Sequence, residues 1–274
     1  MTNPTTAPHL DFDSEQLARA YERESATRQF ESGKRLVADL AIAPGESVLD
    51  VGCGTGRLAE HVADIVGPSG RVLGIDPLPE RIAIAGAKAR ANLAFEVGDA
   101  RELEGSATTS VDVVVLNAVF HWLPEKSGPL ASFFRILRPG GRIGMTTWPP
   151  GRRTALQEVR LQVLGEPPFA GHVRPPDGVL FRVDIERMRT LLEEAGFGDI
   201  RIELRPVEQV FADAEAAIRY SEASSFGNFV GHLPAELRAR ARDEIRRRLQ
   251  DKVGDQPVVR REQRMVVTAR KPEA

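Results

Sequence analysis

The chain has almost no cysteine, since Cys53 is the only one among its 274 residues. A single cysteine excludes an internal disulfide and any metal site built from several thiolates. Histidine is also scarce, and its five copies are scattered without a pair at metal-ligand spacing. We therefore expect no metal site.

Long apolar runs and an excess of one charge are missing as well. No stretch approaches the roughly 18 apolar residues of a membrane span, and residues 1–10 are polar and lack the apolar centre of a signal sequence. We expect a soluble, cytoplasmic protein without a membrane partner. The formal charge is −2 with both signs interspersed, which does not favour nucleic acid. Even the basic stretch 238–252 contains acids at helical spacing, as a solvated helix face does.

What the chain does contain is an apolar strand that runs into a glycine-rich turn. Residues 48–56 read Val-Leu-Asp-Val-Gly-Cys-Gly-Thr-Gly, and an apolar helix pattern follows as far as Val66. A continuous apolar run predicts a buried parallel strand, and glycines let the backbone take positive φ and approach a ligand. Their spacing, GxGxG, is too tight for the GxGxxG turn that binds the pyrophosphate of a dinucleotide.

Three more predicted strands have polar residues at their carboxyl ends. They are residues 71–75 before Asp76-Pro77, residues 93–97 before Gly98-Asp99-Ala100, and the β-branched run 111–117 that ends at Asn117. An acid about 20 residues beyond the glycine turn is placed to accept the hydroxyls of a ribose. Helical patterns at 79–91 and 126–137 follow the second and fourth strands, and Leu-Arg-Pro-Gly-Gly precedes a fifth strand at 142–147.

This ordered series of motifs over residues 48–147 resembles the class I S-adenosylmethionine (SAM)-dependent methyltransferases, in particular small-molecule members of the trans-aconitate and quinone types. The resemblance implies an α/β fold with a Rossmann-like, seven-stranded, mostly parallel sheet, an antiparallel last strand and helices on both faces. It also implies SAM as the cofactor. The residues it places at SAM are Asp50, Gly52, Gly54, Gly56, Asp76, Pro77, Asp99, Ala100 and Asn117, with Tyr21 and Arg28 closing over it.

We expect three regions along the chain. A helical leader occupies residues 1–44, the SAM-binding core 45–148, and the C-terminal part of the same fold 149–274. Strands are predicted at 199–204 and 257–269, and the insertion between them, about 205–256, is too long for a hairpin loop. We expect this insertion to form a helical substrate lid. Aromatic residues expected at the substrate are Trp122, Trp148, Tyr220, Phe226 and Phe229. The predicted assembly is a monomer or homodimer.

The chemistry that the resemblance implies is in-line displacement of an electrophilic methyl group by an oxygen, nitrogen or sulfur nucleophile. The protein must hold the nucleophile in a water-poor cavity, and a protonated hydroxyl or amine also needs a base. His121 is the candidate base because it follows the central strand, and His172 and His232 are alternatives. His121 could instead orient a partner or pack against Trp122.

Three classes of function stay open at this point. The first is a small-molecule methyltransferase, and the second is a SAM-bound cyclase or binding protein of the same fold. The third, a NAD-dependent oxidoreductase, is opposed by the glycine spacing and by Ser224 four residues after Tyr220, where a Tyr-x-x-x-Lys pair needs lysine. The single cysteine argues against the arsenite methyltransferases, whose chemistry uses several thiols. Three arginines could bind a carboxylate of the substrate, namely Arg152, Arg153 and Arg174. Most arginines are surface residues, so they favour such a substrate only weakly.

Overall fold

The computed structural model describes residues 14–103, 110–172, 180–225 and 229–273. Its contacts divide the chain into two compact units. The sheet unit comprises residues 26–150, 181–205 and 264–274, and the helical unit comprises residues 1–25, 151–180 and 206–263. Two strands, β6 and β7, contribute residues to both units.

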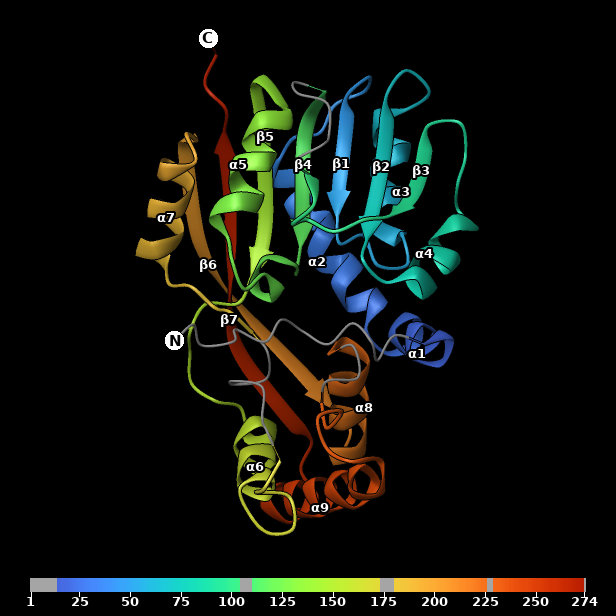
Figure 1. Ribbon diagram of the computed structural model, residues 1–274, viewed down its shortest axis with the longest axis vertical. Coiled ribbons are helices and arrows are strands. Elements are labelled where there is room, and N and C mark those ends of the chain that lie inside the picture. Colours follow the sequence, from blue (N-terminus) through green and yellow to red (C-terminus); the bar gives the residue numbers. More distant parts are fainter. Residues whose placement is uncertain (1–13, 104–109, 173–179, 226–228, 274) are drawn as a thin grey trace. The chain divides into compact units, whose positions relative to one another are not determined.

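The described residues form one seven-stranded sheet in the order β3-β2-β1-β4-β5-β7-β6 (Figure 1). β1 to β5 pair in parallel, and β7 pairs antiparallel with β5. The strands are β1 (Ser47–Val51), β2 (Arg71–Asp76), β3 (Leu93–Val97), β4 (Val111–Asn117), β5 (Leu137–Thr147), β6 (Gly198–Phe211) and β7 (Val258–Arg270). The predicted fold class is confirmed, including the antiparallel last strand.

β4 is buried on both faces, as its β-branched run predicts. Residues 113–116 are 0% exposed. Val114 and Leu116 pack into an apolar cluster with residues of α5 (Ser127–Ile136) and α7 (Ile185–Glu194). Val113 and Val115 pack on the opposite face with residues of α2 (Ala26–Asp39) and α3 (Arg57–Val66). Because strand side chains alternate between faces, this continuous apolar run joins the two cores.

Several helices begin directly after a residue whose side chain caps the first turn. Ser14 accepts the Leu17 N–H at the start of α1 (Glu15–Glu24), and Asp184 accepts the Arg187 N–H at the start of α7. Thr154 and Gln157 form a reciprocal capping box at α6 (Ala155–Leu164). A side-chain oxygen at these positions satisfies an amide that has no partner within the helix.

Three predicted boundaries are wrong. The helix expected at 79–91 is α4 (Pro79–Gly86), because Gly86 has low helix propensity and tight turns follow it. β5 starts at Leu137 rather than at residue 142, because Pro139-Gly140-Gly141 forms part of the strand instead of preceding it. Gly140 allows this with a positive φ of 74°. β6 continues past Pro206 to Phe211, because it lies at the edge of the sheet, where the missing N–H of proline is tolerated.

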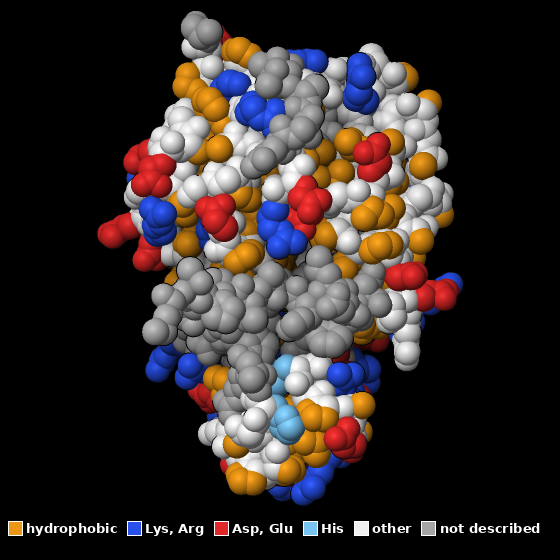
Figure 2. Space-filling view, in the orientation of Figure 1, with side chains coloured by type: hydrophobic (Ala, Val, Ile, Leu, Met, Phe, Trp, Pro, Cys, Tyr) orange, Lys and Arg blue, Asp and Glu red, His pale blue; other side chains and the backbone are white. Residues whose placement is uncertain are grey.

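The helical unit has an apolar core of its own. Residues of α6, α8 (Ala214–Ser224) and α9 (Ala235–Val253) form one buried cluster. The expected insertion between strands six and seven therefore contains helices α8 and α9, as predicted, and α6 and α1 belong to the same compact unit. No helix in the described ranges is both long and apolar enough to cross a membrane. On the face drawn in Figure 2, acidic and basic side chains are interspersed.

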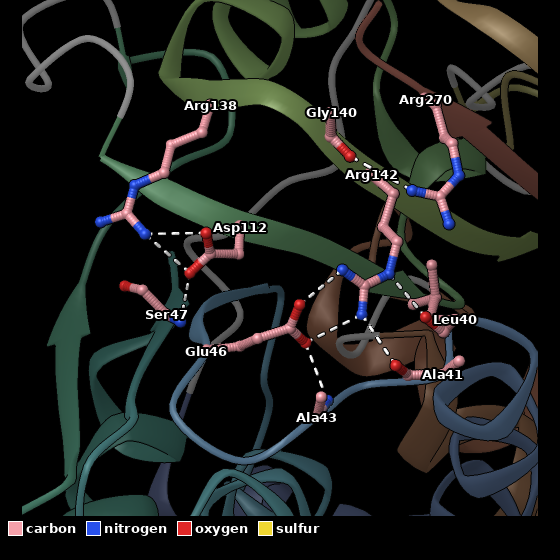
Figure 3. A network of polar contacts seen from close by, with 10 residues as sticks. All are labelled: Leu40, Ala41, Ala43, Glu46, Ser47, Asp112, Arg138, Gly140, Arg142 and Arg270. Carbon is pink, nitrogen blue, oxygen red and sulfur yellow. Dashed lines mark hydrogen bonds and ion pairs between the residues drawn. The ribbon is translucent and has the colours of Figure 1, made fainter. Parts of the chain in front are cut away.

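Ion pairs connect residues at the end of the sheet where the parallel strands begin, which we call the amino-terminal edge (Figure 3). Arg142 on β5 donates to the Leu40 and Ala41 carbonyls at the end of α2 and to both carboxylate oxygens of Glu46. Arg138 binds Asp112, which also accepts the Ser47 N–H. Burial alone would raise the pKa of Glu46. The hydrogen bonds from Arg142 and from the Ala43 amide outweigh burial and lower that pKa.

Candidate functional site

The carboxyl ends of β1 and β4 mark the point where the strand order reverses. From β1 the chain continues outward through β2 and β3, whereas β4, β5, β7 and β6 lie on its other side. Open α/β sheets bind ligands at such a point, outside the carboxyl ends of the strands. The predicted site residues after β1, β2 and β4 therefore reach one edge, which we call the carboxyl edge.

The glycine turn after β1 is held by backbone contacts that leave no room for larger residues. Gly52, Gly54 and Gly56 have φ of 68°, 58° and 83°. The amides of Gly52 and Cys53 both donate to the Ile75 carbonyl, at 2.7 and 2.9 Å. A Cβ on Gly52 would lie 2.3 Å from the Val119 side chain. Glycine is thus favoured by backbone conformation at all three positions and by packing at Gly52 and at Gly56, where a Cβ would lie 2.7 Å from the Phe95 ring.

Two buried carboxyl groups flank this turn. Asp76, 4% exposed, accepts the amide of Gly54 at 2.9 Å and that of Leu78 at 3.1 Å. Asp50 is 2% exposed, and its Oδ2 has no hydrogen-bond partner among the described residues. Burial, together with the nearby Asp76, raises the pKa of Asp50 to about 8. Asp50 is therefore a neutral acid in the folded chain below this pH.

Asp99 and Ala100 follow β3, as predicted, but Asp99 already has a charged partner. Arg101 donates its amide and its Nε to Oδ1 of Asp99, and Nη2 lies 2.5 Å from Oδ2. Burial would raise the pKa of Asp99, and these bonds outweigh burial and lower it. Ala100 is buried in the core, and Pro77 after β2 is half-buried.

Asn117 connects the end of β4 to α2. Its Nδ2 donates to the Gln29 carbonyl at 2.8 Å, and its Oδ1 accepts from the Thr146 hydroxyl at 2.7 Å. Ala118, the next residue, has a positive φ of 61° and donates to Thr146. The predicted cofactor residue Asn117 therefore has its amide engaged with α2 and β5.

His121 lies in the 3₁₀ turn η3 (Phe120–Trp122) after β4. It is 4% exposed, and its Nδ1 lies 3.2 Å from the Thr147 hydroxyl at the end of β5. The Trp122 ring lies 5.5 Å from the imidazole, centre to centre. The contact with the Thr147 hydroxyl orients the imidazole at the carboxyl edge.

Sequence reasoning missed the lysine that holds this turn. Lys126 Nζ donates to the Phe120 carbonyl at 3.1 Å and the Leu123 carbonyl at 2.6 Å, and lies 4.8 Å from the Phe120 ring centre. Burial lowers its pKa to about 8. No motif marks it, because its partners are backbone carbonyls.

Trp148, which the sequence predicted, lies at the end of β5 beside Arg264 and Arg182, two arginines that the sequence did not single out. Trp148, 7% exposed, faces Arg264, whose guanidinium carbon lies 4.7 Å from the ring centre. Arg182 Nη1 lies 3.4 Å from the Pro149 carbonyl. They come from β7 and from the segment before α7, so only the fold brings them together.

The remaining predicted site residues lie elsewhere. Tyr21 on α1 belongs to the helical unit, and Arg28 is exposed on α2. Tyr220 and Phe229 are buried in the core of the helical unit, where Tyr220 accepts a hydrogen bond from Gln209 and Phe229 packs against Arg160. Phe226 lies outside the described residues. Their roles at cofactor or substrate stay predictions.

Comparison with known proteins identifies the family. A methyltransferase-domain family model matches residues 42–162. The chain is 29% identical to a trans-aconitate 2-methyltransferase of Deinococcus radiodurans, over 84% of this chain and 88% of that protein. It is 31% identical to an arsenite methyltransferase of Halobacterium salinarum over 74% of this chain, but spans only 49% of that protein's length. The chain therefore carries a methyltransferase domain over residues 42–162 and is similar to a methyltransferase over most of its length.

A solved structure agrees with the fold of this chain. Phosphoethanolamine N-methyltransferase 2 of Haemonchus contortus, in complex with SAM, superposes with a TM-score of 0.60 at 18% identity, covering 95% of this chain and 58% of that one. SAM is the cofactor of the family, as the resemblance implied.

The carboxyl edge fits SAM by its own chemistry. The buried Asp50 carboxyl keeps an acceptor atom without a partner among the described residues, which a cationic ligand with N–H donors can satisfy. The glycine turn brings main chain rather than side chains to the edge, and α3 begins after Gly56 without a side-chain cap. These features accommodate a ligand that carries both positive charge and hydrogen-bonding groups.

Proposed function

We propose that this chain transfers the methyl group of SAM to a small-molecule metabolite. The observation that carries the proposal is the tight GxGxG turn between the buried acids Asp50 and Asp76 at the point where the strand order reverses. The curated relatives named above support methyl transfer rather than hydride transfer. We also propose a cytoplasmic protein whose partner is a small molecule rather than nucleic acid, supported by the mixed charges in Figure 2.

The proposed roles follow the positions of the residues. Asp76 receives the ribose hydroxyls, Asp99 and Ala100 lie toward the adenine, and the glycine turn lies against the methionine part. When bound, SAM supplies an electrophilic methyl on its sulfonium, so the S–CH3 bond breaks as the acceptor–CH3 bond forms, and sulfur keeps the electron pair. The chain's own contribution is to position the acceptor and exclude water.

His121 is proposed as the base for an acceptor that carries a proton near neutrality. Thr147 engages its Nδ1, which orients the imidazole. Lys126 holds the turn in place through two carbonyls. A carboxylate or thiolate acceptor has no proton to lose and would need no base.

An arsenite substrate is not favoured. Cys53 is the only cysteine, and its thiol pKa is raised by burial and by the nearby Asp50 and Asp76. A neutral thiol is a poor metalloid ligand. The similarity to an arsenite methyltransferase is therefore attributed to the shared cofactor domain.

The deciding experiment is incubation with SAM labelled on its methyl group and a panel of metabolites, with S-adenosylhomocysteine as the product measured. We expect S-adenosylhomocysteine and labelled acceptor in equal amounts. Conversion of an acceptor without release of S-adenosylhomocysteine would indicate a SAM-bound cyclase instead. Binding of NAD in preference to SAM would contradict the proposal.

A further inference from the structure

The carboxyl edge has a second charged region at β5 and β7, away from the cofactor acids. Thr147 at the end of β5 pairs with Met265 of β7. The residues next to this pair are Trp148 and Arg264, and the Arg264 guanidinium carbon lies 4.7 Å from the centre of the Trp148 ring. Trp148 is buried, so its ring is a fixed platform for the guanidinium.

A second arginine reaches the same strand end from a different segment. The Phe181 amide donates to the His121 carbonyl at 2.7 Å, which attaches this segment to the turn η3. The next residue, Arg182, reaches the Pro149 carbonyl with Nη1. Two guanidinium groups therefore lie near residues 147–149, beside the turn that carries His121.

The edge thus carries opposite charges along its length. The carboxylate of Asp76 stands at the end of β2, whereas Arg264 and Arg182 lie where β5 ends. SAM is a cation at its sulfonium, so the acidic part suits the cofactor. The basic part suits an anion beside it, and opposite charges over complementary patches favour such an arrangement.

Stacking also determines the kind of anion. The Arg264 guanidinium is planar and directs its N–H donors within one plane. Paired N–H donors in a plane match the two oxygens of a carboxylate, which accept parallel bonds. A lysine at this position would supply charge without that geometry.

We propose that Arg264, stacked on Trp148, binds a carboxylate of the methyl acceptor and so selects small carboxylic acids. The inference rests on the proposed methyltransferase function and names the substrate class of that site. The 29% identity to a trans-aconitate methyltransferase over most of both chains is consistent with it. Arg182 would add charge beside the bound acid.

The test is calorimetric titration of trans-aconitate into protein saturated with S-adenosylhomocysteine, with its neutral trimethyl ester as the matched ligand. We expect the acid to bind and the ester to bind at least tenfold more weakly. Arg264→Gln should weaken binding of the acid at least tenfold, and Arg264→Lys should restore only part of it. In turnover, KM for the acid should rise in Arg264→Gln while KM for SAM stays within twofold.

Arg270→Gln is the matched control, because Arg270 lies on the same strand at the opposite edge and contacts the Gly140 carbonyl. It should bind trans-aconitate like the parent. Inorganic phosphate is a second ligand, and binding tighter than that of trans-aconitate would overturn the choice of carboxylate.

The outcomes separate this inference from the proposed function. If the parent binds S-adenosylhomocysteine but not trans-aconitate, or if Arg264→Gln binds the acid within twofold of the parent, the carboxylate subsite is refuted and the methyltransferase assignment stands. If the parent fails to bind S-adenosylhomocysteine, the proposed function itself is refuted. Should Arg264→Gln lose S-adenosylhomocysteine binding through misfolding, Arg264→Lys decides, and unchanged affinity for the acid overturns the inference.

Discussion

The acidic side chains Glu46 and Asp112 at the amino-terminal edge of the sheet differ from Asp50 at the carboxyl edge in their hydrogen-bond partners. At the amino-terminal edge Glu46 and Asp112 are paired with Arg142 and Arg138 (Figure 3), and the pKa of Glu46 is lowered. At the carboxyl edge Asp50 is buried, its Oδ2 has no hydrogen-bond partner in the part of the chain that the structure describes, and its pKa is raised to about 8. β1 therefore follows an acid in a satisfied ion pair, Glu46, and contains near its other end an acid, Asp50, with one oxygen that lacks a partner among the described residues.

This difference separates stability from function. A paired and hydrogen-bonded charge stabilises the fold, whereas a buried acid without a full set of partners is destabilising and typical of a binding site. Substitutions at the two edges should consequently have different readouts, unfolding at one and binding or turnover at the other.

The largest effect is expected from His121→Asn. If His121 removes the proton of a hydroxyl or amine acceptor, its loss should lower the single-turnover rate by roughly 10² to 10⁴, with SAM affinity unchanged. The rate of the parent should rise with pH as the base loses its proton, because the base must be neutral. The pH profiles of parent and variant with the same substrate are the measurement. The same ionisation in both would exclude His121 as the base.

At the amino-terminal edge Arg142→Met should act on stability alone. Removing the guanidinium leaves Glu46 and two carbonyls without their donor, and breaking a largely buried pair from one side costs about 3 kcal/mol. Urea unfolding should show this loss, while SAM affinity of the folded protein stays unchanged. Arg138→Met is the control, since its side chain is 48% exposed and should cost less than about 1 kcal/mol. Equal losses in both variants would contradict the reading of Figure 3.

Asp50→Asn should remove a dependence of stability on pH. The pKa of Asp50 is about 8 in the folded chain against an ordinary value of 3.8, so the folded state binds the extra proton between these values. Stability of the parent should therefore fall as pH rises from about 5 to about 8, by at most roughly 1.4 kcal/mol per pH unit. The variant, which stays neutral, should show a flatter profile. Parallel urea-derived profiles in parent and variant would show that Asp50 is ionised throughout.

The regular part of the fold was predictable because its signals are local. The β-branched run 111–117 predicted a strand, and β4 spans the same residues. The extension of β6 past Pro206 was not predictable, because it depends on β6 being an edge strand. Edge position is a property of the whole sheet.

The residues predicted for the cofactor could be found from sequence because Asp50, the glycines and Asp76 lie in one βαβ segment, and the fold brings them to one edge of the sheet. The arginines proposed for the substrate could not be found in this way. Arg264 meets Trp148 from more than a hundred residues away, and Lys126 binds carbonyl groups that any residue carries. Such contacts have no short-range spacing that a sequence pattern could reveal.

The central claim is that the carboxyl edge binds SAM, and calorimetric titration of Asp76→Ala tests it most directly. Loss of a charged hydrogen-bond partner costs roughly 1.5 to 3 kcal/mol. We therefore expect SAM and S-adenosylhomocysteine to bind the parent, NAD not to bind, and Asp76→Ala to bind SAM at least tenfold more weakly. Asp112→Ala, at the opposite edge, should bind SAM like the parent. Unchanged SAM affinity in a folded Asp76→Ala variant would contradict the account.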